Sequence, residues 1–270
     1  MSRIAAAFGR MQEERRVGLV TYVTAGDPSL ERTADILTAL DRAGADVLEV
    51  GVPFSDPLAD GPVIQRACER ALAAGATLDR ILGVIRSVRA SVRAPIVLFS
   101  YANPIYRMGF GTFAARAAEA GVDGVLALDI PIEEAGPIRT ALIAHGLDPI
   151  YLLSPTTTPE RARRAGELGR GFLYLISRAG VTGARESLPA GLPAMAVTVR
   201  EGVRLPLAVG FGLSRPEHVL AVAGVADAAV VGSALVSVVA DAGDTRALVP
   251  RVEAYVRWLR GEQPGGGLRD

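Results

Sequence analysis

The sequence of 270 residues contains no lysine, and all 29 of its basic residues are arginine. Genomic base composition is the simplest origin of this bias, but the chemical consequence holds whatever the origin. Schiff-base catalysis and the covalent attachment of pyridoxal phosphate both require a lysine amine. Neither chemistry can use a residue of this chain.

Cysteine, net charge and long apolar runs are also scarce. Cys68 is the only cysteine, which excludes a disulfide framework and suits a reducing compartment. The 29 acidic residues balance the basic ones, so no nucleic-acid or membrane-surface partner is indicated. The most apolar window, 228–240, is 13 residues long, too short to span a bilayer, and residues 1–16 lack the apolar core of a secretory signal. We therefore expect a cytoplasmic globular protein.

Metal-binding and nucleotide-binding patterns are missing as well. His145 and His218 are the only histidines, lie far apart without spaced partners, and are both predicted to lie on helix surfaces. A zinc or Cys–His site is therefore not expected, and we predict no metal site. The sequence also contains no GxSxG elbow, no GxGxxG fingerprint and no phosphate-cradling GxxxxGK[ST].

What the sequence does contain is a regular alternation of short apolar runs with longer segments of helical period. The eight runs cover residues 17–23, 46–52, 94–101, 124–130, 148–153, 171–177, 205–211 and 228–233. Runs that are apolar throughout are typical of parallel strands covered on both faces. Eight strand–helix units in about 250 residues predict an α/β fold of the (β/α)₈ or TIM-barrel type. A doubly wound sheet is the alternative, because periodicity cannot show closure.

No linker or shift in composition divides the chain, so we expect one barrel domain over residues 1–260. An extra N-terminal helix is predicted before the first strand, and the glycine-rich tail 261–270 is predicted to be disordered. In barrels of this type the active site forms at the C-terminal ends of the strands and in the following loops. Candidate functional residues are therefore expected there.

Glu49 is a lone acid inside the second apolar run, VLEVGV. Side chains alternate along a strand, so Glu49 would point either into the barrel mouth or into the helix layer. An ion pair with a nearby arginine would be the structural explanation. A carboxyl in an apolar pocket instead has a raised pKa and can both donate and accept a proton near neutrality. Glu49 is therefore a candidate general acid–base.

Asp60 lies in the rigid loop after that run, where Pro53 and Pro57 restrict the backbone. It is a second candidate carboxylate, but it could equally be the N-cap of a helix that begins near Pro62. Asp56, which precedes Pro57, is predicted to be a turn residue.

Glycine-rich turns close the last two runs, as GFG at 210–212 and GS at 232–233. Barrels build phosphate sites at this position from backbone N–H groups and a helix N-terminus. A tight turn without a ligand would look the same. The segment 177–191 is the longest loop, has three glycines and is predicted to be a lid, on which Thr182 is a candidate partner for a carboxylate.

These motifs together resemble one family, the α subunit of tryptophan synthase. The resemblance rests chiefly on LEVGVPFSDPLADGPVIQRA (48–67) and YLISRAGVTGARESLP (174–189). It is reinforced by TYVTAGDP (21–28), YANPI (101–105), VGFGLS (209–214) and VVGSALV (230–236), which follow in the family's order over nearly the whole chain.

The resemblance implies a (β/α)₈ barrel that cleaves indole-3-glycerol phosphate to indole and glyceraldehyde 3-phosphate. It implies that Glu49 protonates indole C3 and takes a proton from the glycerol hydroxyl. Asp60 would accept a hydrogen bond from the indole N–H, and Thr182 would close onto Asp60. The substrate-binding residues that it implies are Gly183, Gly212, Gly232 and Ser233 for the phosphate, and Tyr22, Phe99, Leu126, Tyr174 and Phe211 for the indole pocket.

The resemblance also implies a partner, a β subunit that carries pyridoxal phosphate in an α₂β₂ complex and receives indole through a tunnel. The chain itself would carry no cofactor. The contact is expected to involve the loops 53–60, 101–107 and 177–189. The interface residues predicted from the resemblance are Pro53, Asp56, Pro57, Asn103, Pro104 and Asp129.

Few positions depart from the family pattern. Tyr22 stands where phenylalanine is common, and Thr21 and Ile132 stand where proline is frequent. Two alternatives stay open at this point: another indole or phosphosugar barrel enzyme of the same pathway, and a catalytically silent barrel that activates the β subunit. The loop EVGVPFSDPLADGP argues against the first, and the presence of both Glu49 and Asp60 argues against the second.

Overall fold

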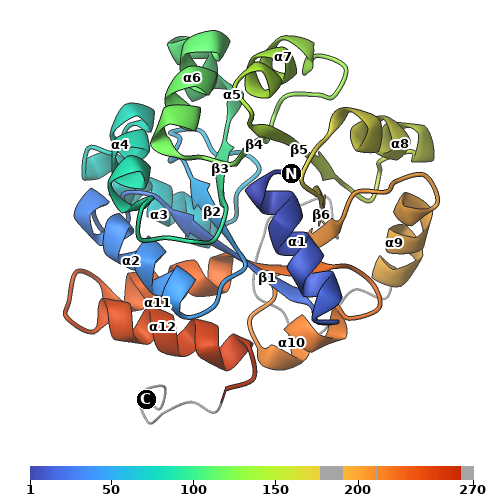
Figure 1. The fold of residues 1–270 in the computed structure, drawn as a ribbon. Coiled ribbons are helices and arrows are strands. Elements are labelled where there is room, and N and C mark those ends of the chain that lie inside the picture. Colours follow the sequence, from blue (N-terminus) through green and yellow to red (C-terminus); the bar gives the residue numbers. More distant parts are fainter. Residues whose placement is uncertain (177–190, 211, 263–270) are drawn as a thin grey trace.

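Eight parallel strands form a closed barrel in the order β1 to β8, with β8 pairing back onto β1 (Figure 1). The computed structural model describes residues 1–176, 191–210 and 212–262. Each predicted apolar run contains one strand to within one residue, so the predicted (β/α)₈ barrel is confirmed and the doubly wound alternative is wrong. The strands are β1 (Gly18–Thr24), β2 (Val47–Gly51), β3 (Ile96–Ser100), β4 (Gly124–Ala127), β5 (Asp148–Leu153), β6 (Leu173–Ile176), β7 (Leu207–Gly210) and β8 (Ala228–Val231).

The helices of the described residues surround this barrel, and most of them connect one strand to the next (Figure 1). They are α1 (Arg3–Glu13), α2 (Leu30–Arg42), α3 (Pro62–Ala73), α4 (Leu78–Val88), α5 (Ala102–Met108), α6 (Phe110–Ala120), α7 (Gly136–Ala144), α8 (Pro159–Leu168), α9 (Leu192–Arg200), α10 (Pro216–Ala221), α11 (Ser233–Ala242) and α12 (Leu248–Leu259). None of the helices in the described ranges is long and apolar enough to cross a membrane.

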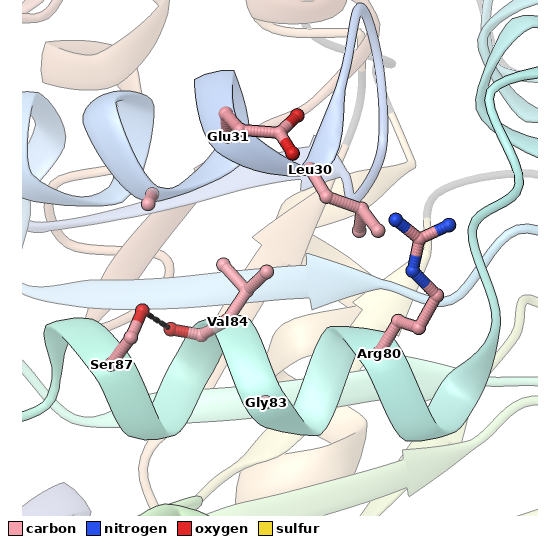
Figure 2. A pocket seen from close by; sticks show the side chains of 7 residues that line it. Leu30, Glu31, Arg80, Gly83, Val84 and Ser87 are labelled. Atoms are coloured by element: carbon pink, nitrogen blue, oxygen red, sulfur yellow. Dashed lines mark hydrogen bonds between the residues drawn. The ribbon is translucent and has the colours of Figure 1, made fainter.

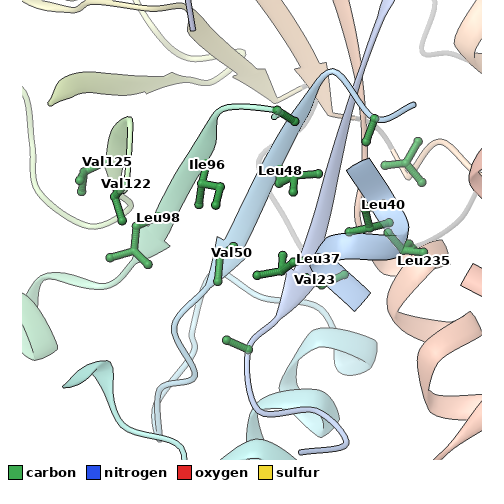
Figure 3. Packing of buried hydrophobic residues seen from close by; sticks show 14 of the residues in the cluster. Val23, Leu37, Leu40, Leu48, Val50, Ile96, Leu98, Val122, Val125 and Leu235 are labelled. Carbon is green, nitrogen blue, oxygen red and sulfur yellow. The ribbon is translucent and has the colours of Figure 1, made fainter. Parts of the chain in front are cut away.

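Alternation along each strand separates an inner cluster from an outer one. Leu48 and Val50 of β2 belong to the cluster between the barrel and the helices, which also contains Leu37 and Leu40 of α2 (Figure 3). Val47 faces the other way and belongs to the cluster inside the barrel. Because Glu49 shares a face with Val47, its side chain points into the barrel.

The predicted N-terminal helix closes one end of the barrel. In α1, Ser2 caps the N-terminus by accepting a hydrogen bond from the Ala5 N–H, and its hydroxyl donates to Asp148 on β5 at 2.5 Å. Ile4 and Phe8 are almost completely buried in the inner cluster, and the Phe8 and Phe172 ring centroids lie 5.3 Å apart. Figure 1 shows α1 lying across the barrel. With this end plugged, the opposite end, where the strands terminate, is the one free to receive a ligand.

Glycines end several of the helices, as predicted. Gly121 caps α6 in the left-handed conformation with φ of 87°, and Gly44, Gly146 and Gly224 also have positive φ just after helices. The chain after α12 is described only to Glu262. The predicted disorder of the tail 261–270 and the single-domain assignment of 1–260 stay predictions.

Candidate active site

Glu49 is a fully buried acid in the middle of β2. It lies in register with Tyr22 of β1 and Val97 of β3, both of which face the barrel interior. Neither carboxyl oxygen has a hydrogen-bond partner in the described part of the chain. No guanidinium of the described residues reaches this carboxyl, so these residues give the alternative of an arginine ion pair no support.

Burial determines the protonation of Glu49. Removing the carboxyl from water disfavours its charged form and raises the pKa of Glu49 from 4.5 to about 8. The group is therefore mostly protonated at neutral pH but can lose its proton within about one pH unit of neutrality. It can act first as an acid and then as a base.

Asp60 occupies the loop between β2 and α3 and is half-buried. Gly61, not Asp60, is the N-cap of α3, so the capping alternative is wrong. The carboxylate of Asp60 instead accepts a hydrogen bond from the Tyr101 hydroxyl at 3.1 Å. Burial raises the pKa of Asp60 to about 6, and the hydrogen bond from Tyr101 opposes this rise. Asp60 is therefore mostly ionised at neutral pH.

Two tyrosines, on β1 and β6, are electrostatically coupled to both acids. Tyr22 of β1 lies over Gly51, where a Cβ would come within 2.2 Å of its hydroxyl. Tyr174 of β6 lies over Gly210 in the same way, at 2.4 Å. Burial raises the pKa of both phenols, and the negative charges of Glu49 and Asp60 raise it further. One site therefore contains both acids and both rings.

Apolar side chains complete the interior of this site. Phe99 of β3 meets Tyr22 edge-on, with ring centroids 5.5 Å apart and planes at 80°. Leu126 of β4 is paired with Phe99 in register and is completely buried. The predicted residues Tyr22, Phe99, Leu126 and Tyr174 thus come together from four strands, in an arrangement suited to a flat aromatic ring. The Tyr22 hydroxyl lies 3.4 Å from Thr24 Oγ1, so it does add a polar group to this pocket.

The predicted phosphate-binding turns lie beside the pocket. Gly232 is the N-cap of α11, no side chain caps this helix, and Ser233 is its first residue and is buried. A Cβ on Gly232 would lie 3.5 Å from Tyr22 Cβ, so this helix start adjoins the pocket. Gly212 follows β7 with φ of 66°. Uncapped backbone N–H groups at a helix N-terminus favour an anion.

Three predicted substrate-binding residues, Thr182, Gly183 and Phe211, lie outside the described residues, as does most of the predicted lid at 177–191. Their roles stay predictions.

The residues predicted for the partner contact mostly reach the surface. Asp56 and Asn103 are exposed, and Pro57 and Pro104 are half-buried. Asp129 is exposed and accepts a hydrogen bond from the Ala102 N–H at 2.6 Å. Pro53 is buried, so a contribution from it to a contact would be indirect.

A second hollow lies in the outer helix layer, between α2 and α4 (Figure 2). This groove has a volume of about 360 Å³, and it is lined by Leu30, Glu31, Ala34, Arg80, Gly83, Val84 and Ser87. Its charged residues Glu31 and Arg80 are exposed, and no strand contributes to it. It offers no buried polar group comparable to Glu49.

One prediction about the histidines is wrong. His145 is exposed at the C-cap of α7, but His218 is buried on α10 and its Nδ1 accepts a hydrogen bond from the Ser214 N–H at 3.3 Å. Across the described ranges, no three His, Cys, Asp or Glu residues are grouped so that they could hold a metal ion.

Tyr101 is a site residue to which the sequence assigned no individual role. It lies in the YANPI motif, directly after β3, and is the hydrogen-bond donor to Asp60. Its position at the C-terminal end of a barrel strand is the only signal that could have identified it. The contact itself joins two loops and has no local pattern.

Comparison with known proteins agrees with this geometry. The family model of the tryptophan synthase alpha chain matches residues 8–261. The alpha chain of Solibacter usitatus is 46% identical over 260 residues, which cover 96% of this chain and 97% of that protein. The alpha chain of Geobacter sulfurreducens is 49% identical over 236 residues, covering 87% and 89%.

Solved structures give the same result. The crystal structure of the tryptophan synthase alpha subunit from Legionella pneumophila is 39% identical, with a TM-score of 0.87 over 97% of this chain and 98% of that one. A chain of Mycobacterium tuberculosis tryptophan synthase is 35% identical, with a TM-score of 0.89 over 96% and 97%. The chain therefore belongs to the tryptophan synthase alpha chain family.

Proposed function

We propose that the chain cleaves indole-3-glycerol phosphate to indole and glyceraldehyde 3-phosphate, as a lyase that uses general acid–base catalysis. The observation that carries this function is the fully buried carboxyl of Glu49 on β2, for which the described residues offer no hydrogen-bond partner. Its pKa of about 8 and the pKa of about 6 of Asp60 give the two acids different protonation states at neutral pH. Carbon–carbon cleavage with an aromatic leaving group requires such a pair.

In the first step, protonated Glu49 gives its proton to C3 of the indole. This protonation breaks the ring's aromaticity and leaves positive charge on the ring nitrogen. Ionised Asp60 accepts a hydrogen bond from the ring N–H and stabilises that charge. Without a carboxylate opposite the nitrogen, the acid alone would face a much higher barrier.

In the second step, the bond between C3 and the glycerol carbon breaks, and its electron pair restores the indole ring. The hydroxyl on the glycerol carbon becomes a carbonyl, and its proton passes to the carboxylate of Glu49. The acid thereby returns to its starting state. No lysine Schiff base is needed, because the leaving group is indole and not an enolate.

The phosphate of the substrate would bind at the start of α11, through Gly232, Ser233 and Gly212, and through Gly183. These groups are neutral donors, and they would be assisted by the dipole of a ten-residue helix. We further propose that Thr182 closes onto Asp60 when substrate is bound, and that Phe211 covers the indole.

The indole produced would pass to a β subunit, in an α₂β₂ complex, for the synthesis of L-tryptophan. Pyridoxal phosphate would be bound by that subunit, since this chain has no lysine to hold it. Two apolar side chains on the proposed contact loops support such a partner, because Leu58 is 93% exposed and Tyr106 is 72% exposed. The free, buried Cys68 suits the cytoplasmic location that we propose.

The test is to supply indole-3-glycerol phosphate to the purified chain, with and without its β subunit, and to measure indole. A silent barrel would release none in either case, and another enzyme of the same pathway would give a different product. The variant Glu49→Gln should still bind substrate but lose turnover by about 10²–10⁴-fold. Glu31→Gln, the same chemical change in the exposed outer groove, is the matched control and should retain full turnover.

A further inference from the structure

Tyr101 joins two loops of the active site through a single hydroxyl. The residue follows β3 directly, is the N-cap of α5 and is 6% exposed. Its hydroxyl donates to Asp60 Oδ2 at 3.1 Å and accepts a hydrogen bond from the Ala59 N–H, also at 3.1 Å. The side chain of Asp60 and the backbone preceding it are therefore both held by one atom.

The phenol ring of Tyr101 is itself held in place. It stacks on Phe54, with ring centroids 5.0 Å apart and planes inclined by 27°. The Tyr101 carbonyl accepts a hydrogen bond from Ser100 Oγ at 2.8 Å, and the following Ala102 N–H is held by Asp129. The hydroxyl thus extends from an anchored residue toward the Asp60 loop.

Among the described residues, few other contacts anchor Asp60. Its backbone N–H donates to the Pro57 carbonyl at 3.0 Å, and its carbonyl accepts from Gln65 Nε2 at 2.8 Å. Tyr101 is the only residue in the described ranges that donates a hydrogen bond to its carboxylate. The neighbours Leu58 and Ala59 are exposed, so packing of the loop does little to fix this side chain.

We propose that Tyr101 is a positioning residue for the reaction, which holds the Asp60 carboxylate in place and keeps it ionised through its hydroxyl. This inference rests on the proposed function, because it concerns how Asp60 is prepared to stabilise the charged ring. A hydroxyl that donates to a carboxylate favours its ionised form, and a fixed carboxylate loses no orientation in the transition state.

No other titratable group of the described residues donates a hydrogen bond to the Asp60 carboxylate. Tyr22, Cys68 and Tyr174 are coupled to the charge of Asp60, and burial raises the pKa of each, so all three are neutral and none places a positive charge near this carboxylate. Glu49 on β2 is protonated at neutral pH. The pKa of Tyr101 is itself raised by burial and by the charge of Asp60, so its hydroxyl stays a donor throughout the working pH range.

The test is Tyr101→Phe, which removes the hydroxyl and keeps the stacked ring. Losing a hydrogen bond to a charged group should lower kcat/KM by about 10-fold or more. The pKa of Asp60 should rise by about one pH unit, so the acidic limb of the kcat/KM profile should move to higher pH. Tyr151→Phe removes a buried hydroxyl that has no partner in the described residues, and it should change neither quantity.

A second measurement keeps this proposal separate from the proposed function. The Asp60 carboxyl can be titrated by ¹³C NMR in the substrate-free protein and in the Tyr101→Phe variant. If the wild-type chain releases no indole, the proposed function fails, but the titration still decides the role of Tyr101. An unchanged Asp60 titration, or wild-type kcat/KM in Tyr101→Phe, would show that only the ring matters and would overturn the proposal.

Discussion

Burial of Glu49 should cost the folded chain stability, and the cost should grow with pH. The unfolded chain ionises this carboxyl near its ordinary pKa of 4.5, whereas burial raises the folded-state pKa to about 8. Between these values the folded chain keeps a proton that the unfolded chain has lost. The contribution of Glu49 is therefore most favourable below pH 4.5 and declines until the pH passes about 8.

The magnitude follows from the separation of the two pKa values. At about 1.36 kcal/mol per pH unit, the interval from 4.5 to about 8 corresponds to about 5 kcal/mol. Glutamine has nearly the same size and no charge at any pH. The free energy of unfolding of Glu49→Gln, relative to the wild type, should therefore rise by about 4 kcal/mol between pH 5 and pH 9, most of that interval. This is a large fraction of the stability of a typical protein.

The assay is urea unfolding of both proteins at pH 5, 7 and 9, followed by circular dichroism. Burying an amide in place of the carboxyl changes the free energy of unfolding by the same amount at each pH. The prediction therefore concerns only how the difference in free energy of unfolding between the variant and the wild type changes with pH. Glu31→Gln is the control, because Glu31 is exposed and hydrogen bonds from its own backbone and from Ser29 lower its pKa. Its difference should be small and of opposite sign. A difference for Glu49→Gln that does not vary with pH would show that Glu49 is ionised in the folded chain.

Two further predictions concern activity and packing. The dependence of kcat/KM on pH should be bell-shaped, with an acidic limb near pH 6 from ionisation of Asp60 and an alkaline limb near pH 8 from loss of the Glu49 proton. A flat profile between these pH values would contradict the roles assigned to Asp60 and Glu49. Gly51→Ala should destabilise the chain by about 1–3 kcal/mol and reduce turnover, because the new methyl group would collide with the Tyr22 hydroxyl. Gly111→Ala, with open space around the new methyl group, is the control. Equal urea midpoints for Gly51→Ala and the wild type would refute the collision.

The sequence predicted most of the fold because the relevant patterns are local. Each strand falls within an apolar run to within one residue. The alternation of side chains along β2 predicted that Glu49 points either into the barrel or into the helix layer, and the first of these is correct. The start of α3 at Pro62 was predicted correctly, but its N-cap is Gly61. Sequence position could not separate a capping aspartate from a catalytic one, since both stand just before a helix.

What the sequence could not show depends on contacts between distant segments. Tyr101 and Asp60 are 41 residues apart, and their hydrogen bond exists because two loops meet above the barrel. His218 looked like a surface residue because a six-residue helix is too short to show which of its faces is buried. The sequence, with 29 arginines, offered many possible ion pairs for Glu49. Only the assembled barrel shows that none of the described residues makes one.

The two acids differ in function because they lie on different kinds of element. A group that must give a proton to carbon and take one from oxygen needs a pKa near the working pH and freedom to reach both atoms. A hydrogen-bond donor to Glu49 would lower its pKa and restrict its carboxyl, so the absence of such a donor among the described residues serves the reaction. Asp60 must instead stay ionised and fixed in position. Its half-exposed loop and the hydrogen bond from the Tyr101 hydroxyl both favour this state. The stability lost at Glu49 and the ability of Glu49 to transfer protons thus have the same physical origin, the removal of an unpaired carboxyl from water.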